Sequence, residues 1–270
     1  MSCRDMLAGL RVSDVMKPCT VFISSREPVT TARAMMRENG LRTLPVVDGG
    51  RLEGVLTPRE VMQVTSTRSN IPVSGVMFPT RLLVTPGMPL SELARQMAEL
   101  DVNDMPVLQN QTDRTVVGLV KMEDVLRKIS SKFSPKLLVE SVMTKEVVSC
   151  SGEDDVRQVW EQMEQARYSG IPVVSYDRAR RVKRVVGIIS RSDIIGTGTA
   201  RISEESRKGR ASPKVKTIMR TPALKISPKA PVVEAVDVMV RKNIGRMPVV
   251  ENDDLVGIIT RYDVVAAACG

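Results

Sequence analysis

The sequence contains no histidine, and this absence narrows the chemistry open to it. Histidine is the base of Ser-His-Asp and Cys-His arrangements and the commonest metal ligand in proteins. Neither kind of catalytic arrangement nor a histidine metal site is therefore available. Nothing else in the chain resembles an activated nucleophile or a paired acid and base. We expect a protein that is not an enzyme, with no catalytic residues and no bound metal.

Cysteine, aromatic residues and long apolar runs are also scarce. The four cysteines are scattered, without metal-ligand spacing or the density of a disulfide scaffold. Aromatics make up 3% of the residues against 16 methionines, so the core should be aliphatic, with thioethers filling its gaps. No apolar run reaches the length of a membrane span, and Arg4 and Asp5 stand where a secretory apolar segment would lie. We expect a cytoplasmic protein without a membrane partner.

What remains is a globular, basic composition. The 270 residues are 42% hydrophobic, enough for two ordinary domains or several small ones. Lys and Arg number 40 against 31 Asp and Glu, a net charge of +9. This charge favours acidic partners such as nucleotides, nucleic acid or an acidic protein surface, although a solvated basic surface explains it too.

One unit occurs four times in the chain. Each copy opens with a methionine after valine or isoleucine, and a proline between apolar residues follows 29 positions later. A second methionine lies nine positions before each proline. The sets are Met16, Met36 and Pro45; Met77, Met97 and Pro106; Met143, Met163 and Pro172; and Met219, Met239 and Pro248. A register kept four times indicates an internal repeat of about 55 residues.

Hydrophobic periodicity predicts the elements of each unit. Val21 and Ile23 alternate as a strand would, and 90–97 carries apolar residues at helical spacing. In the fourth unit two apolar runs, 247–250 and 255–259, flank a polar turn and predict a hairpin, with a helix to about 268. The predicted fold class is α/β (α+β), with strand-helix-strand-strand-helix repeats. Each repeat is too small to bury both faces alone, so we expect them to pack in pairs.

The segments between the repeats suggest the domain limits. We expect domains at 8–68, 69–133, 136–198 and 211–270, the first paired with the second and the third with the fourth. Residues 199–210 are predicted to form a flexible basic loop. The hairpin of the third repeat adds five more cations at 178–184. These basic stretches suit nucleic acid, although aromatic stacking partners are few, and a solvated surface is the alternative.

A short motif opens the last helix of each repeat: glycine, two apolar residues, Thr or Ser, two further residues and an acid. The copies are Gly54 to Glu60, Gly187 to Asp193, Gly257 to Asp263, and Gly118 to Asp124, where Lys121 replaces the hydroxyl residue. A helix capping box explains the motif, most fully at Thr57 and Glu60.

Two details favour a ligand beside this explanation. The third and fourth copies follow their hydroxyl residue with aspartate, whereas the capping box calls for Glu or Gln. Arg191 and Arg261 directly follow the hydroxyl residue, although the helix dipole disfavours cations at a helix start. A helix N-terminus with a hydroxyl and an arginine suits a phosphate, and an acid nearby suits a ribose diol.

These residues resemble a known family, the tandem cystathionine beta-synthase (CBS) domains, over nearly the whole chain. The resemblance is carried by the Val-x-x-Val-Met openings at 12–16 and 73–77, the apolar-Pro-Val-Val segments, and the helix-start motif. It implies β-α-β-β-α repeats packed pairwise into two pseudo-twofold modules (Bateman modules), each with two clefts. Such clefts often bind AMP, ADP, ATP or S-adenosylmethionine. Four copies are similar to the gamma subunit of AMP-activated protein kinase, in which two modules make a disc.

The resemblance also implies roles for single residues. Aspartates at the helix starts would hold ribose hydroxyls, the hydroxyl residues would meet the first phosphate, and a basic residue would precede the proline. Thr57 and Glu60 are a weaker copy, and Asp124 is intact beside Lys121. The candidate ligand-binding residues are Arg246, Thr260, Arg261, Asp263, Ser190, Arg191, Asp193, Arg42, Thr57, Glu60 and Asp124.

The predicted function is non-catalytic sensing of an adenine nucleotide (AMP, ADP or ATP), with no obligatory cofactor. Ligand binding would be passed on to a regulated protein partner, or to self-association into a disc-like assembly. The fourth repeat alone combines Arg246, Thr260, Arg261 and Asp263, so the best site is expected there. The alternatives are S-adenosylmethionine as ligand, nucleic-acid binding through the basic loops, and a structural module with degenerate clefts.

Overall fold

The computed structural model describes residues 7, 9–64, 71–79, 83–100, 102–131, 133–196 and 212–269. The chain divides into two compact units, Met1–Lys132 with Val265–Gly270, and Phe133–Val264. The predicted basic loop at 199–210 lies outside the described residues. The domain limits given above stay a prediction.

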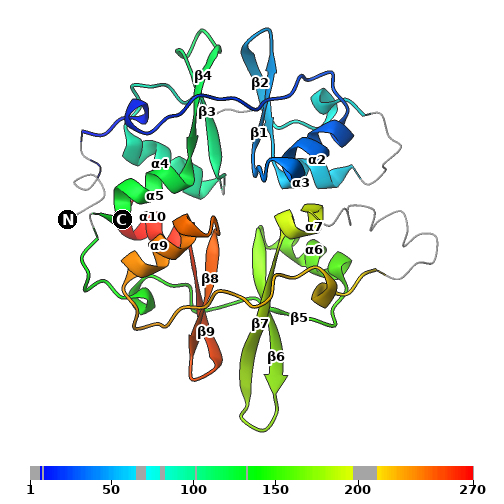
Figure 1. The fold of residues 1–270 in the computed structure, drawn as a ribbon, viewed down its shortest axis with the longest axis vertical. Coiled ribbons are helices and arrows are strands. Elements are labelled where there is room, and N and C mark those ends of the chain that lie inside the picture. Colours follow the sequence, from blue (N-terminus) through cyan, green and yellow to red (C-terminus); the bar gives the residue numbers. More distant parts are fainter. Residues whose placement is uncertain are drawn as a thin grey trace. The chain divides into compact units, whose positions relative to one another are not determined.

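The first unit contains the first two repeats (Figure 1). Its elements are η1 (Val12–Asp14), α2 (Val29–Glu38), β1 (Leu44–Asp48), β2 (Arg51–Leu56), α3 (Pro58–Gln63), η2 (Val73–Gly75), α4 (Leu90–Glu99), β3 (Asp104–Leu108), β4 (Val116–Lys121) and α5 (Met122–Ser130). β1 pairs with β2 and β3 with β4, both antiparallel. The two hairpins lie side by side, joined by a bridge between Arg51 and Thr115.

The second unit contains the third and fourth repeats. Its elements are η3 (Val139–Ser141), β5 (Cys150–Ser151), α6 (Val156–Gln165), β6 (Gly170–Asp177), β7 (Val182–Ser190), α7 (Arg191–Gly196), η5 (Val215–Thr217), α9 (Val232–Arg241), β8 (Arg246–Glu251), β9 (Asp254–Thr260) and α10 (Arg261–Cys269), whose last residues group with the first unit. β6 pairs antiparallel with β7, and β8 with β9. All four hairpins shift register between the first and the second residue after the repeated proline, so the repeats share even this irregularity.

The predicted strand-helix-strand-strand-helix order is confirmed, but its first strand is very short. Among the described residues, the third repeat alone forms it as a strand, with Cys150 and Ser151 parallel to β6. In the other repeats it is a single parallel bridge: Ile23 to Val46, Val84 to Val107, and Ile226 to Val249.

The core of each repeat is aliphatic, as the composition predicts. The helical methionines Met36, Met97, Met163 and Met239 are buried, and the last three are fully so. The methionine stripe is therefore core. Cys150 is also buried, and burial raises the pKa of its thiol to about 12, which leaves it protonated at neutral pH.

Within each unit the two repeats exchange their opening segments. We call the repeat that receives a segment the mate of the one that supplies it. The amide of Val139 donates to the carbonyl of Ala230 at 2.9 Å, and the amide of Val232 donates back to the carbonyl of Leu137 at 2.8 Å. The first unit repeats this exchange, with the amide of Val12 donating to Met88 and that of Leu90 to Leu10.

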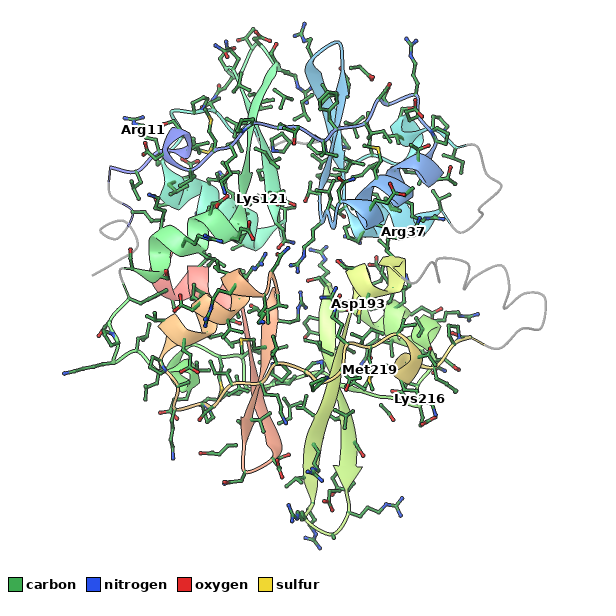
Figure 2. The ribbon with its side chains drawn as sticks, in the orientation of Figure 1. Arg11, Arg37, Lys121, Asp193, Lys216 and Met219 are labelled. Atoms are coloured by element: carbon green, nitrogen blue, oxygen red, sulfur yellow. The ribbon has the colours of Figure 1, made fainter. Side chains whose placement is uncertain are left out.

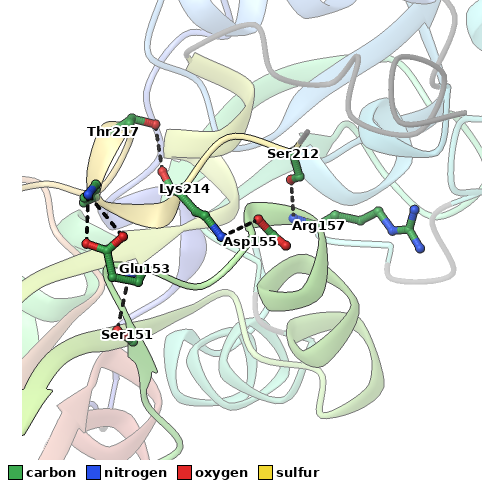
Figure 3. Close-up of polar contacts among 8 residues, drawn as sticks. Ser151, Glu153, Asp155, Arg157, Ser212, Lys214 and Thr217 are labelled. Atoms are coloured by element: carbon green, nitrogen blue, oxygen red, sulfur yellow. Dashed lines mark hydrogen bonds and ion pairs between the residues drawn. The ribbon is translucent and has the colours of Figure 1, made fainter. Parts of the chain in front are cut away.

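Ion pairs accompany the exchange where the fourth repeat opens onto α6 (Figure 3). The ammonium of Lys214 lies 3.0 Å from a carboxylate oxygen of Asp155, and that of Lys216 lies 2.8 Å from Glu153. The amide of Arg157 donates to the hydroxyl of Ser212 at 3.3 Å. Because Asp155 and Arg157 stand at the start of α6, the opening segment of the fourth repeat fixes the beginning of a helix in the third.

The opening methionine of each repeat crosses the glycine of its mate's helix-start motif. A Cβ on Gly187 would lie 2.7 Å from Sδ of Met219 and 2.9 Å from the carbonyl oxygen of Arg220. Met143 crosses Gly257 in the same way, as do Met77 and Met16 at Gly54 and Gly118. The repeated methionine thus packs against the repeated glycine, where a side chain would leave no room for it.

Candidate ligand site

The helix-start motif of the first repeat is a complete capping box. The amide of Thr57 donates to Oε2 of Glu60 at 2.9 Å, and its hydroxyl donates to the same oxygen at 2.5 Å. The amide of Arg59 in turn donates to the Thr57 hydroxyl at 3.2 Å. The capping interpretation of this copy is confirmed.

The two aspartate copies cap their helices in the same way, with one carboxylate oxygen. Oδ2 of Asp193 accepts the amide of Ser190 at 2.9 Å and its hydroxyl at 2.5 Å. Oδ2 of Asp263 accepts the amide and the hydroxyl of Thr260, both at 2.7 Å. Aspartate is therefore long enough for this cap, and its presence alone is no sign of a ligand. The second carboxylate oxygen of each aspartate, Oδ1, takes no part in the cap.

That second oxygen faces a side chain from the mate repeat. Oδ1 of Asp193 accepts Nε of Arg220 at 2.5 Å, and Oδ1 of Asp263 accepts the hydroxyl of Thr144 at 3.2 Å. In the first unit, Oδ1 of Asp124 accepts Nζ of Lys17 at 2.7 Å. All three donors directly follow an opening methionine; the corresponding residue of the second repeat is Phe78, whose side chain has no donor.

Sequence reasoning missed these donors. Their backbones are held in equivalent places, because each exchanges two hydrogen bonds with the residue after the mate's glycine: Arg220 with Ile188, and Thr144 with Ile258. One signal in the sequence could have indicated them. The residue directly after each opening methionine has a fixed place in the repeat, but its type differs in every copy.

The second repeat has Lys121 in place of the hydroxyl residue, and this changes the hydrogen bonding of its acid, Asp124. Lys121 makes no side-chain cap to α5, which it precedes (Figure 2). Oδ2 of Asp124 is buried and has no hydrogen-bond partner among the described residues. In the other three repeats the hydroxyl of Thr or Ser donates a hydrogen bond to the acid of the motif, and Lys121 does not make this bond.

Restoring the hydroxyl with Lys121→Thr is expected to raise the free energy of unfolding by about 0.5–2 kcal/mol, the usual contribution of an N-cap. Urea denaturation measures the change. Lys121→Val, which has the shape of threonine without the hydroxyl, is the matched control. A valine variant as stable as the threonine variant would contradict the capping explanation.

Arg246 and Arg42, the predicted phosphate ligands before the proline, both reach across to the mate repeat. Arg246 donates from Nη1 to the carbonyl of Gly170 at 2.7 Å and from Nη2 to the hydroxyl of Ser169. Arg42 donates to Oδ1 of Asn103 at 3.3 Å. Each arginine thus joins the beginnings of two hairpins.

The contact of Arg246 brings the best predicted residues of the second unit to one end of its hairpins. Arg246 stands opposite Thr260 in the β8–β9 register, and Gly170 stands opposite Ser190 in the β6–β7 register. Because α7 and α10 begin directly after Ser190 and Thr260, both capped aspartates belong to this end. The structure therefore gathers Ser190, Asp193, Arg246, Thr260 and Asp263.

Arg191 and Arg261 turn back onto their own repeats. Arg191 donates to the carbonyl of Met163 at 3.2 Å, pairs with Glu164 at 2.9 Å, and stacks over the ring of Trp160. Arg261 donates to the carbonyl of Ile244 at 3.1 Å and to the side chain of Asn243. These acceptors lie at or just beyond the C-terminal ends of α6 and α9, where the helix dipole favours a cation. The contacts explain both arginines without a ligand, and their role at a phosphate stays a prediction.

The helices of the described residues are all too short or too polar to span a lipid bilayer. No group of three or more Asp, Glu, Cys or His side chains there is placed to hold a metal ion.

Comparison with known proteins gives four matches to one family model, that of the CBS domain, at residues 12–66, 73–131, 139–197 and 215–270. The chain is 23% identical over 284 residues to protein MJ1225 of Methanocaldococcus jannaschii, covering 95% of this chain and 97% of that protein. The crystal structure of MJ1225, described as a proposed archaeal homologue of g-AMPK, has a TM-score of 0.82 over 95% of this chain and 99% of that chain, at 20% identity. This likeness shows the fold.

Other relatives are longer than this chain. Protein MJ1404 of the same archaeon is 24% identical over 265 residues, which cover 94% of this chain and 61% of that protein. A homoserine O-acetyltransferase of Methanohalobium evestigatum is 30% identical over 122 residues, 45% of this chain and 23% of the enzyme. The repeats thus also occur as parts of larger proteins.

Proposed function

Because the chain belongs to the CBS domain family, we propose that it is a non-catalytic regulatory protein that binds an adenine nucleotide in its second unit. One observation carries the proposal: the capped Asp263 and Arg246 lie at one end of the paired hairpins, where Arg246 reaches from the fourth repeat to Gly170 of the third. A ligand bound there would touch both repeats at once. AMP, ADP and ATP are the proposed ligands.

The proposed roles follow from the contacts that the residues make. Oδ2 of Asp263 is held by the helix cap, whereas Oδ1 makes one long contact among the described residues, from the Thr144 hydroxyl at 3.2 Å and near the surface. We propose that Oδ1 accepts a ribose hydroxyl. Arg246 and the hydroxyl of Thr260, opposite each other in the strand register, would meet the phosphate.

Isothermal titration calorimetry with AMP and ATP tests this site. Asp263→Ala is expected to weaken binding about 10- to 100-fold, because a hydrogen bond to a charged group is lost. Asp237→Ala, an exposed aspartate on α9 of the same unit, is the matched control and should bind as the wild type does. Equal heats for wild type and Asp263→Ala would remove Asp263 from the site.

The same titration separates nucleotides from S-adenosylmethionine, the alternative ligand. S-adenosylmethionine has no phosphate, so Arg246→Ala should weaken AMP and ATP binding and spare S-adenosylmethionine. A wild type that binds S-adenosylmethionine tightly and both nucleotides weakly would replace the proposed ligand class.

We further propose that binding changes how the two repeats pack, and that a protein partner or a second copy of the chain responds. A ligand shifts such an equilibrium only by its differential affinity for the two arrangements. Sedimentation velocity with and without AMP or ATP tests self-association.

A second candidate function, nucleic-acid binding, is favoured by the β6–β7 hairpin. Its turn and adjoining strand carry five exposed cations: Arg178, Arg180, Arg181, Lys183 and Arg184. Only Asp253 pairs with any of them among the described residues, at 3.7 Å to Arg180 and 3.6 Å to Arg184. Such exposed pairs are weak, so the hairpin keeps most of its positive field.

If this hairpin binds nucleic acid, replacing Arg178, Arg180 and Arg181 by glutamine is expected to flatten the salt dependence of binding. On duplex DNA the slope of log K against log salt should lose about 0.9 per phosphate contact removed. Fluorescence anisotropy at several salt concentrations measures it. A matched triple replacement of Arg37, Arg95 and Arg241, exposed on α2, α4 and α9, should leave the slope unchanged. An affinity indifferent to salt would dispose of this candidate.

A further inference from the structure

We propose that the residue after each opening methionine decides whether the mate's aspartate is open to ligand: Arg220 closes Asp193, and Thr144 leaves Asp263 open. The inference deepens the proposed function and rests on it. It assigns the nucleotide to one of two equivalent places in the second unit, and it names residues outside the helix-start motif as the cause.

The backbone that carries these two side chains is built alike at the two places. Arg220 and Ile188 exchange backbone hydrogen bonds of 2.8 and 3.0 Å, and Thr144 and Ile258 exchange two of 2.9 Å. Beside these pairs, Met219 crosses Gly187 and Met143 crosses Gly257 (Figure 2 labels Asp193 and Met219). The side chains of Arg220 and Thr144 therefore start from matching positions and end on matching atoms, Oδ1 of the two aspartates.

The two contacts differ in charge and in length. Arg220 is a cation whose Nε lies 2.5 Å from Oδ1 of Asp193. The Asp193 side chain is only 6% exposed, whereas that of Arg220 is 61% exposed. A charge-assisted hydrogen bond to a buried carboxylate is among the stronger polar contacts in proteins. A neutral ribose diol would have to displace the guanidinium from its counter-ion. The site at Asp193 is closed for this reason.

Thr144 offers far less competition. Its hydroxyl is neutral and lies 3.2 Å from Oδ1 of Asp263, a long bond for two oxygen atoms. A ribose hydroxyl can replace it without separating charges, and Asp263 keeps its negative charge available. The site at Asp263 is therefore open.

The first unit follows the same rule. Nζ of Lys17 lies 2.7 Å from Oδ1 of Asp124, whose side chain is 12% exposed, so this carboxylate also has a cation from the mate. Phe78 has no donor, and the acid of its mate is Glu60 rather than an aspartate, so the rule does not extend to this copy. The expected occupancy of the three aspartate copies is thus one nucleotide, at Asp263.

Exchanging the two side chains tests the inference, with AMP and ATP as probes in calorimetry. Arg220→Thr is expected to add a second binding site, and Arg220→Lys, which keeps the cation, is the matched control that should not. Thr144→Arg should weaken the wild-type site about 10- to 100-fold. The double exchange, Arg220→Thr with Thr144→Arg, should bind one nucleotide, at Asp193 instead of Asp263. Circular dichroism melts verify that each variant is folded.

Aspartate-to-asparagine changes locate the site in each background. In the wild type Asp263→Asn should weaken binding and Asp193→Asn should not; in the double exchange the dependence should reverse. Wild-type binding with no gain in folded Arg220→Thr, or wild-type binding that requires Asp193, would overturn the inference and leave the proposed function standing. No binding by any of the proteins would overturn both.

Discussion

Replacing Met239 by alanine is expected to lower the free energy of unfolding of the second unit by about 2–5 kcal/mol, the range for truncating a buried large side chain to alanine. Met239 is fully buried on the inner face of α9, beside the buried Ala235 and Val236. The shortened side chain leaves a cavity that the surrounding β-branched residues fill poorly. Urea denaturation followed by circular dichroism measures the loss.

Asp237→Ala on the exposed face of the same helix is the matched control, with an expected change within about 0.5 kcal/mol. The comparison also decides what the methionine stripe is for. If Met239→Ala leaves stability unchanged but abolishes nucleotide binding, the stripe belongs to a ligand site rather than to the core.

Replacing Gly187 by alanine is expected to destabilise the second unit by about 1–3 kcal/mol, the cost of forcing one carbon into a filled space. The new Cβ would lie 2.9 Å from the carbonyl oxygen of Arg220, and a backbone atom cannot turn aside as a side chain can. That carbonyl accepts the amide of Ile188, so relief of the clash has to strain this hydrogen bond. The guanidinium of Arg220 is then expected to lose its place on Asp193.

Gly152→Ala is the control for this substitution. Its Cβ would meet only Cβ of Lys216, at 3.4 Å, an ordinary contact distance. A Gly187→Ala protein as stable as Gly152→Ala would show that the opening segment of the fourth repeat yields easily. The crossing of methionine and glycine would then not hold the repeats together.

The local elements of the fold could be predicted from the sequence, because their signals are local. Apolar residues three and four positions apart identify α4 and α9, and the polar turn at Asn252 and Asp253 identifies the β8–β9 hairpin. The length of the first strand of each repeat could not be predicted from the alternating pattern. Val21 and Ile23 alternate as in a strand, yet only Ile23 forms a bridge, because the chain meets its neighbour at one residue.

The contacts of the candidate site could be predicted only in part. The hydroxyl and the acid of each cap are three positions apart, so the motif shows them directly. Thr144 and Asp263 are 119 positions apart, and no periodicity links them. Arg261 illustrates the opposite difficulty. Its place at a helix start suggested a phosphate, whereas its side chain is long enough to reach Asn243 and Ile244 at the end of α9.

The exchange of opening segments bears on what happens when a repeat is produced alone. The segment around Val139 bonds to the start of α9, and the segment around Val215 bonds to the residues before α6, so neither repeat satisfies its own opening. Two identical copies of one repeat could satisfy each other by the same exchange, which is the geometry of a domain-swapped dimer. A fragment holding a single repeat is therefore expected to be a symmetric dimer in solution. In this dimer a second copy of the fragment takes the place of the mate repeat.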